Sequence, residues 1–382
     1  KITIDFDNNN NLFLKGKGDV LIQDKNDFFS YKIENQKKSI DFDITLILKE
    51  NQLFLNFINF EKNKDLKTTL KIKGKKEINK NLFINNFSLD EGENRINIQD
   101  LVFNQNNQII KFKKAKFNYL DKEKKFNQFN INLKKNKYLL KGNYFNANYL
   151  IENLIKKSEK NKFSLFTSSL LISINLDKVF LDKIYDLSRF SGSFLYKNNE
   201  IIDASLIGYF TRDKKLSFTV KEHENEKITT LFLDEAEPLV KRYRFIKGFR
   251  NGSLDLNSIK KNKVSKSTLR IYNFKLKELP ILTKLLTLAS LQGIADILSG
   301  EGIRFDKFEM KYSNKDDLIT IDEAFAIGPA ISLLMKGYIE KDKLISLRGT
   351  LVPATTINKA IGSIPVLGEI LVGSKTGEGV FG

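Results

Sequence analysis

The stretch SIDFDITLILK, residues 39–49, alternates between apolar and polar side chains over most of its length. Its apolar set is Ile40, Phe42, Ile44, Leu46 and Leu48. Asp41, Asp43 and Thr45 stand between them. Successive side chains of a β-strand point to opposite faces of the sheet. This period of two therefore predicts a strand with one apolar face and one polar face.

The same alternation opens the chain, as KITIDFD at residues 1–7, and returns along most of its length. Later apolar sets are Phe129/Ile131/Leu133, Leu170/Ile172/Ile174/Leu176, Leu216/Phe218/Val220, Leu254/Leu256, Leu269/Ile271 and Ile345/Leu347. Short polar segments such as KNNE (197–200) and EKDK (340–343) separate such runs, as hairpin turns do. The pattern predicts a mostly antiparallel β chain whose strands share one apolar face.

Three stretches break this rhythm, at residues 146–162, 234–249 and 277–302. The first is typical of a helix or linker, and the second of a short helix. In the third, apolar residues recur at helical spacing and predict a helix over 280–298. These residues include Leu282, Leu285, Leu286, Ile294 and Ile297. The helix either packs on the sheet as core or lies beside an apolar groove, and both interpretations stay open.

At 382 residues the chain exceeds the usual domain size of about 100–200 residues, which predicts several domains or one elongated architecture. The net charge of +18 would suit nucleic acid or a membrane surface. However, lysine rather than arginine dominates, and the lysines are scattered between apolar residues. Heavy use of Lys, Asn, Ile and Phe is also what an AT-rich genome produces. We therefore expect no nucleic-acid partner.

Residues suited to catalysis are scarce. The chain has no cysteine, so it has no disulfide and no cysteine nucleophile. Its single histidine, His223, stands among Glu222, Glu224 and Glu226 in KEHENEK, which indicates either a metal site or a solvated hairpin turn. A metal site needs further convergent ligands, which favours the turn. No phosphate-binding GxxxxGK[ST] loop occurs. We expect a protein that is not an enzyme and has no catalytic residue, metal or cofactor.

Three motifs carry a resemblance to a known family. They are LSGEGIRFD (298–306), RGTLVPA (348–354) and IGSIPVLGEILVG (361–373), which is followed by GEGVFG. In this order they resemble the C-terminal region of the AsmA-like/TamB superfamily, and are most similar to its YhdP-type branch. The resemblance covers about residues 230–382 and extends more faintly to about 165. The family's GGxL reads Asn251–Gly252–Ser253–Leu254 here.

The resemblance implies a mostly β fold. Its long antiparallel sheet would curl into an elongated trough, the β-taco, with a few short amphipathic helices. Residues 1–160 would form an N-terminal segment of this trough, and residues 161–382 the AsmA-like C-terminal region. The chain would be a fragment of a longer periplasmic protein of Gram-negative bacteria. An N-terminal helix outside this sequence would anchor that protein in the inner membrane.

The resemblance also implies a function without catalysis. The protein would carry phospholipid along a hydrophobic groove between the inner and outer membrane surfaces, as part of outer-membrane biogenesis. Two alternatives stay open: a periplasmic structural or assembly factor, and a module whose lysines bind anionic head groups. Residues 363–373 would plug the groove, contact a membrane or cap the last strands. The candidate lipid-contacting residues are Leu254, Leu256, Leu269, Ile271, Leu282, Leu285, Leu286, Ile294, Ile297, Phe305, Ile345 and Leu347.

Overall fold

A computed structural model confirms the predicted mostly β class with short helices, at 74% strand. It describes residues 2–6, 11–23, 25–78, 80–156, 169–197, 200–243, 248–277, 300, 302–340 and 343–353. The chain divides into two compact units, unit 1 (residues 1–201) and unit 2 (residues 202–382). In each unit the strands form a curled sheet that does not close into a barrel. The division predicted between residues 160 and 161 falls inside unit 1.

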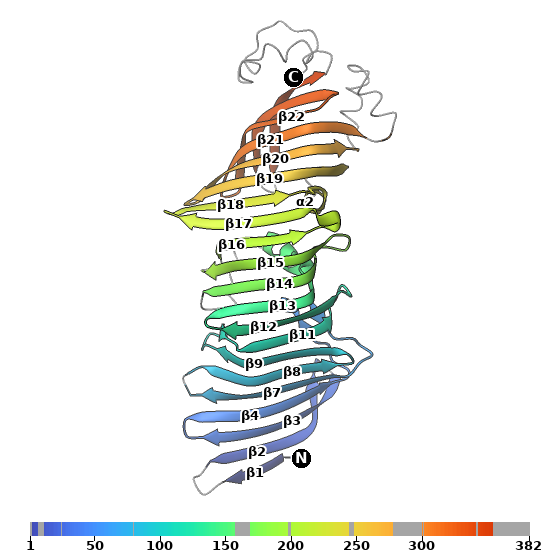
Figure 1. Cartoon of the computed structure of the whole chain (residues 1–382). Helices are drawn as coiled ribbons and strands as arrows, with labels where there is room; N and C mark the ends of the chain where they lie inside the picture. The colour runs from blue at the N-terminus through green and yellow to red at the C-terminus, as the bar shows by residue number, and fades with distance from the viewer. Residues whose placement is uncertain are drawn as a thin grey trace. The chain divides into compact units, whose positions relative to one another are not determined.

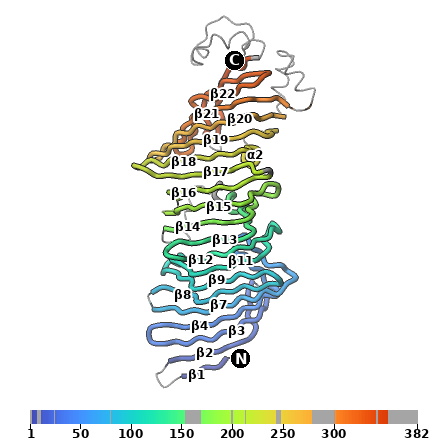
Figure 2. Tube along the Cα trace, in the orientation of Figure 1, coloured from blue at the N-terminus to red at the C-terminus, as the bar shows by residue number. Residues whose placement is uncertain are grey.

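In unit 1, most strands that follow one another in the chain are neighbours in the sheet (Figures 1 and 2), although β10 and β11 both pair with β9. The strands are β1 (Ile2–Phe6), β2 (Leu12–Ile22), β3 (Lys25–Gln36), β4 (Ser39–Leu48), β7 (Thr68–Glu77), β8 (Leu82–Glu91), β9 (Asn94–Phe103), β10 (Ile109–Lys111), β11 (Lys114–Leu120), β12 (Phe126–Lys134), β13 (Lys137–Asn146), β14 (Leu170–Phe180) and β15 (Asp186–Lys197). Tight turns join many of them. Lys135 and Asn136, with φ of 46° and 63°, form the left-handed two-residue turn that matches the twist of a hairpin.

One pairing departs from the predicted antiparallel sheet. β13 and β14 run parallel, with Leu140 opposite Ile174, so the expectation of antiparallel pairing is wrong here. A parallel pair needs a connection that returns to the starting side of the sheet. Residues 147–169 supply it, and they include α1 (Asn148–Lys156). The helix predicted within 146–162 is therefore confirmed as far as residue 156, and residues 157–168 lie outside the described part.

Buried polar side chains hold the start of α1. Asn146 Nδ2 donates to Asp121 Oδ2 at 2.7 Å, and the Asn146 backbone N–H donates to Asn127 Oδ1 at 2.8 Å. Asn148 Nδ2 donates to Glu123 Oε1 at 3.0 Å. Buried polar groups are costly unless they are hydrogen-bonded, so these contacts fix the helix against the β11–β12 turn.

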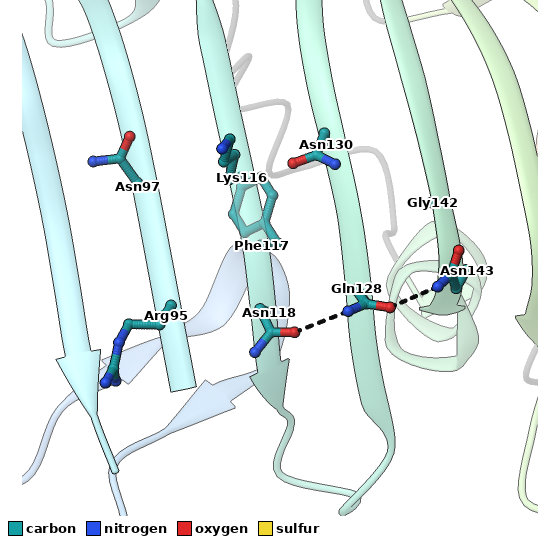
Figure 3. Close-up of a pocket in the computed structure, with 9 residues that line it drawn as sticks. All are labelled: Arg95, Asn97, Lys116, Phe117, Asn118, Gln128, Asn130, Gly142 and Asn143. Carbon is teal, nitrogen blue, oxygen red and sulfur yellow. Dashed lines mark hydrogen bonds between the residues drawn. The ribbon is translucent and has the colours of Figure 1, made fainter. Parts of the chain in front are cut away.

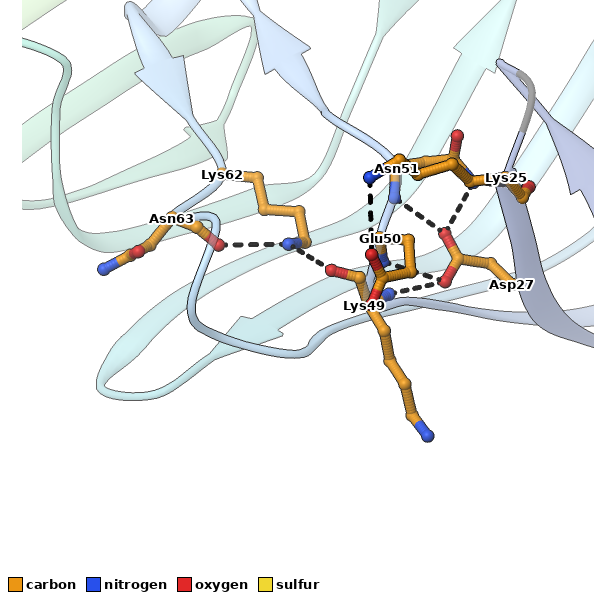
Figure 4. Close-up of polar contacts among 7 residues, drawn as sticks. All are labelled: Lys25, Asp27, Lys49, Glu50, Asn51, Lys62 and Asn63. Carbon is orange, nitrogen blue, oxygen red and sulfur yellow. Dashed lines mark hydrogen bonds and ion pairs between the residues drawn. The ribbon is translucent and has the colours of Figure 1, made fainter.

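The connection between β4 and β7 forms a small substructure of its own. It contains β5 (Phe54–Leu55), η1 (Asn56–Ile58) and β6 (Phe60–Glu61). Lys62 is 4% exposed, and its Nζ donates to the carbonyls of Lys49 and Asn63, each at 3.0 Å. Figure 4 shows these contacts beside the carboxylate of Asp27, which is 2% exposed. This β4–β7 connection (residues 49–67) is therefore fixed at both ends.

The Asp27 carboxylate accepts hydrogen bonds from the Lys49 backbone at 2.6 Å and from Asn51 Nδ2 at 2.8 Å. It also accepts from the backbone N–H groups of Glu50 and Asn51. Burial raises the pKa of Asp27, but these hydrogen bonds outweigh burial and hold the pKa below its ordinary value of 3.8. The charged carboxylate is thus the form that the fold favours.

Unit 2 follows the same chain-order pattern with antiparallel pairs (Figure 1). Its elements are β16 (Glu200–Tyr209), whose first residues fall in unit 1, η2 (Thr211–Asp213), β17 (Lys215–His223), β18 (Glu226–Leu233), α2 (Glu237–Tyr243), β19 (Phe249–Lys261), β20 (Val264–Leu276), β21 (Ile303–Lys315), β22 (Leu318–Ile327), β23 (Ile331–Glu340) and β24 (Leu344–Pro353). α2 confirms the short helix predicted within 234–249. The helix predicted at 280–298 and the segment 363–373 lie outside the described residues.

Three aromatic rings form the core near the start of β19. Phe249, Phe274 and Phe305 stack with successive centroid distances of 5.3 Å, and they are 0%, 2% and 0% exposed. Gly252 has a φ of 78°, and a Cβ at this position would stand 2.9 Å from the Phe274 Cβ. The Asn251–Gly252 pair, expected at a turn, is thus a kink inside β19 that lets this strand approach Phe274 closely.

Candidate functional site

Residues directly opposite one another on neighbouring strands share a face of the sheet. When opposite residues are followed from strand to strand, they form apolar rows that cross the sheet of unit 1. The half-buried row of unit 1 comprises Tyr31, Ile44, Ile72, Phe87, Ile98, Ala115, Ile131, Leu140, Ile174 and Gly192. The buried row of unit 1 comprises Phe29, Leu46, Leu70, Leu89, Ile96, Phe117, Phe129, Gly142, Leu176 and Phe190. Both rows run from β3 to β15.

The two rows differ in how far the protein covers them. In the buried row, Leu89 is 0% exposed, Ile96 1% and Leu176 2%, and Leu70, Phe117 and Phe129 are buried as well. The row's other members, Phe29, Leu46, Gly142 and Phe190, are half-buried. In the half-buried row, Phe87 and Ile98 on the same two strands as Leu89 and Ile96 keep part of their surface open. Apart from the small Ala115, the whole half-buried row behaves in this way. The sheet thus presents a continuous apolar row that the described residues leave partly uncovered.

The β4–β7 connection covers the buried row where it crosses β11. Tyr119 donates a hydrogen bond from its hydroxyl to the Ile58 carbonyl at 2.9 Å, and its ring meets Phe60 edge-on at 6.0 Å. Phe117 stacks on Phe129 at 4.6 Å in the same layer. Burial, with a smaller contribution from the Asp121 charge, raises the pKa of Tyr119. Tyr119 therefore stays neutral and serves as a packing residue.

Unit 2 repeats the arrangement within its own sheet. Its half-buried row comprises Leu206, Phe218, Leu231, Leu256, Leu269, Met310, Ala324, Met335 and Gly349. Its buried row comprises Gly208, Leu216, Leu233, Leu254, Ile271, Phe308, Ala326, Leu333 and Leu351. Leu233 is 1% exposed, whereas Leu231 is half-buried.

The candidate residues on β19–β21 fall into two groups. Leu254 pairs with Ile271 in the buried row of unit 2, and each is 3% exposed. Leu256 pairs with Leu269 in the half-buried row. Phe305 belongs to the fully buried aromatic stack. The structure thus brings four of these side chains onto one face, and only Leu256 and Leu269 keep surface that a ligand can reach.

Two of the remaining candidates lie on β24 (Leu344–Pro353). Ile345 and Leu347 lie on β24 opposite Ile339 and Gly337, and they are 67% and 46% exposed. The other candidates lie outside the described residues: Leu282, Leu285, Leu286, Ile294 and Ile297. For these, contact with a lipid stays a prediction.

The rows of unit 1 carry candidate residues that the sequence did not single out, among them Ile72 and Phe87. Alternation within each strand indicates that both residues face the apolar side. Only the register between strands shows that they belong to one row. Register irregularities between Lys73 and Gly74 and between Gln128 and Phe129 shift that register. A period of two within one strand cannot locate such shifts.

The opposite face of each unit is polar. In unit 2, Glu309 is 8% exposed and binds Arg270 Nε at 3.1 Å and Lys307 Nζ at 2.9 Å. Burial raises the pKa of Glu309, but the hydrogen bonds from Lys307 and Arg270 outweigh it and lower the pKa. In unit 1, Lys116 and Lys141 stand opposite Asn130 without a carboxylate partner among the described residues. An ion-pair network thus surrounds Glu309 in unit 2, whereas Lys116 and Lys141 in unit 1 stand beside an amide.

A cavity of about 380 Å³ lies on the polar face of unit 1 (Figure 3). Asn143 Nδ2 donates to Gln128 Oε1 at 2.8 Å, and Gln128 Nε2 donates to Asn118 Oδ1 at 3.4 Å. Arg95 at its border is already bound to Asp90, with Nε 2.9 Å from Oδ1. This lining is polar and largely satisfied by its own members, so it offers nothing to an apolar chain.

The structure confirms the hairpin predicted around the single histidine. His223 pairs with Glu226 at the end of β17, and the turn residues Glu224 and Asn225 have φ of 49° and 65°. The His223 side chain is 79% exposed. Across the described part of the chain, no group of three or more His, Cys, Asp or Glu side chains could hold a metal ion.

Comparisons with known protein families, with curated proteins and with solved structures give no match to this chain. Among the described residues, no helix has the length and apolar character needed to span a membrane. The site is therefore interpreted from its own geometry.

Proposed function

We propose that the apolar face of each unit binds lipid acyl chains, and that the protein is a non-enzymatic segment of a bridge-like lipid-transfer protein. The observation that supports this proposal is the half-buried row, which is apolar across successive strands yet incompletely covered by the part of the chain that the structure describes. A fold gains most when apolar surface leaves water, at about 25 cal/mol per Å². A row left half-covered in both units is where an apolar ligand would add that burial.

The direction of the rows favours an extended ligand. Neighbouring strands stand about 4.8 Å apart, so a row that crosses many strands offers a long, narrow apolar track. An acyl chain is a linear apolar ligand that can follow such a track, while its head group stays in water. A compact ligand would instead be held by an enclosed pocket with a few convergent polar groups.

The finer parts of the proposal rest on the AsmA-like motifs. They are the trough that encloses a groove, the carriage of phospholipid between inner and outer membranes, the periplasmic location and the inner-membrane anchor. In the alternative role, a structural or assembly factor for the outer membrane, the same face would bind a protein segment and any lipid would be incidental.

Native mass spectrometry of the purified protein tests the proposal. We expect mass additions that correspond to phospholipid, and we expect Ile98→Asp to reduce them, because a charge in an acyl-chain track lacks water and a partner. Asn97→Asp is the matched control, since Asn97 is the adjacent residue on the polar face and should keep the lipid. Leu256→Gln repeats the test in unit 2. Equal lipid content in the parent and in folded Ile98→Asp and Leu256→Gln would refute the proposal.

A further inference from the structure

A second cavity of unit 1, of about 640 Å³, lies outside both apolar rows. Four segments line it. The β4–β7 connection contributes Phe54 and Phe60, the β11–β12 turn contributes Lys122 and Lys124, α1 contributes Tyr149, and the β14–β15 turn contributes Lys183. These segments are far apart in the chain, and the sheet brings them together because they all follow strand ends on one side of it.

The charges around this cavity are unbalanced. Three lysines face a single carboxylate, Glu123. That carboxylate is already engaged, because Asn148 Nδ2 lies 3.0 Å from each of its oxygens. Lys122 pairs with Glu61 at 3.2 Å. Lys124 and Lys183, by contrast, have no carboxylate partner among the described residues. Two cations therefore remain at the cavity for an anionic ligand.

An exposed aromatic ring stands beside one of the same lysines. Phe54 in the lining is 45% exposed, and its ring lies 5.7 Å from Lys122 Nζ. Next to lining residues in the chain, Phe57 is 55% exposed, Leu150 50% and Ile184 79%. Exposed apolar side chains on each of these segments, with one of them in the cavity beside a cation, favour a contact site over ordinary solvated turns.

We propose that this cavity binds the phosphate-bearing head group of an anionic lipid, with the neighbouring aromatic and aliphatic side chains against the adjoining hydrocarbon. This inference rests on the proposed function and adds to it a preference for lipids with an anionic head group. Charge alone would suit any anion, but the exposed Phe54 in the lining suits a ligand that also has an apolar part. The exposed Phe57, Leu150 and Ile184 follow lining residues directly in the chain. Phe60 links the cavity to the apolar face, because it lines the cavity and its ring also meets Tyr119.

The experiment measures binding of short-chain dihexanoyl phosphatidylglycerol, as monomers, to the whole chain by isothermal titration calorimetry. Dihexanoyl phosphatidylcholine and inorganic phosphate are the comparison ligands. We expect the anionic lipid to bind most tightly. Lys124→Gln/Lys183→Gln should weaken its binding about thirtyfold, since each lysine near an anionic head group contributes on the order of 1 kcal/mol. The matched control Lys116→Gln/Lys141→Gln removes the same charge from the polar face and should leave binding unchanged.

Three outcomes would overturn the inference: equal binding of phosphatidylcholine, phosphate binding as tight as that of the anionic lipid, or equal losses in the two double variants. Thermal unfolding of every variant confirms that the fold is intact. The result is separable from the proposed function. If native mass spectrometry still shows phospholipid that Ile98→Asp removes, only the head-group site fails. If the lysine variants behave as expected but Ile98→Asp keeps its lipid, the acyl-chain proposal fails.

Discussion

The buried and half-buried rows of unit 1 lie side by side on one face of one sheet, and both are apolar. They differ in what covers them. Leu89 and Ile96 are closed off from solvent, whereas Phe87 and Ile98, two residues away on the same strands, are not. The buried row thus needs no ligand to justify its composition. The half-buried row keeps an apolar composition without full cover, and this makes it the better candidate for function.

Unit 2 supports the same distinction, since Leu233 is buried and Leu231 is half-buried on one strand. Different elements pack on the two sheets: the β4–β7 connection covers part of the buried row of unit 1, and α2 contacts β19 in unit 2. Although these elements differ, the described residues of both units leave an apolar row incompletely covered. The repetition is easier to explain by a shared ligand than by two separate packing defects.

The largest expected effect comes from breaking the buried row. Leu89→Ala should lower the free energy of unfolding by about 2–5 kcal/mol, because it leaves a cavity among fully buried neighbours. Ile98→Ala, in the half-buried row, should cost less than half as much, because solvent already reaches that side chain. Urea denaturation of both variants measures the difference. Equal costs would mean that the two rows are one core.

The next largest effect concerns Asp27, whose carboxylate anchors the β4–β7 connection. The pKa of Asp27 is depressed in the folded state, so its contribution to stability is present above the unfolded pKa of about 3.9 and is lost as pH falls through the lower folded pKa. Unfolding free energy should therefore fall between about pH 5 and about pH 2 more steeply in the parent than in Asp27→Asn. Parallel pH profiles for the two proteins would contradict this role.

The smallest expected effect compares a charged side chain on the polar face of unit 2, Glu309, with one on the polar face of unit 1, Lys116. Glu309→Gln should destabilise the protein by about 1 kcal/mol, because it weakens a network in which the acceptor is buried but its cations are partly exposed. Lys116→Gln, which removes a lysine that has no carboxylate partner among the described residues, should stay within about 0.5 kcal/mol of the parent. Thermal unfolding in low and high salt compares them, and only the Glu309 effect should shrink with salt.

The period of two in the sequence predicted the strands and their apolar faces, but not the direction of every strand or the elements that cover them. Alternation in residues 39–49 and in the later apolar sets identified strands and their apolar sides correctly, because burial of one face imposes that pattern. It did not predict the parallel β13–β14 pair, since strand direction depends on the connection at 147–169 rather than on alternation. Nor did it separate Leu254 from Leu256, because both face the same side and only the covering elements distinguish them.

The sequence alone does not predict the cavity lined by Lys124 and Lys183, and the reason is similar. Its lining comes from turns that are distant in sequence, and each turn alone reads as an ordinary solvated loop. The exposed Phe57 and Ile184 were the available signal, but apolar residues in loops acquire meaning only when seen gathered and exposed. Local composition cannot show that.

The most direct test of the acyl-chain proposal compares two adjacent residues on opposite faces. A photo-reactive phenylalanine analogue placed at Ile174, in the half-buried row, should crosslink to phospholipid in cells that express the protein. The same analogue at Asn175, which faces the polar side and is exposed, should not. Lipid adducts at position 174 and none at 175 are the predicted result. Equal labelling at both positions, or no lipid at position 174 in the folded protein, would contradict the account.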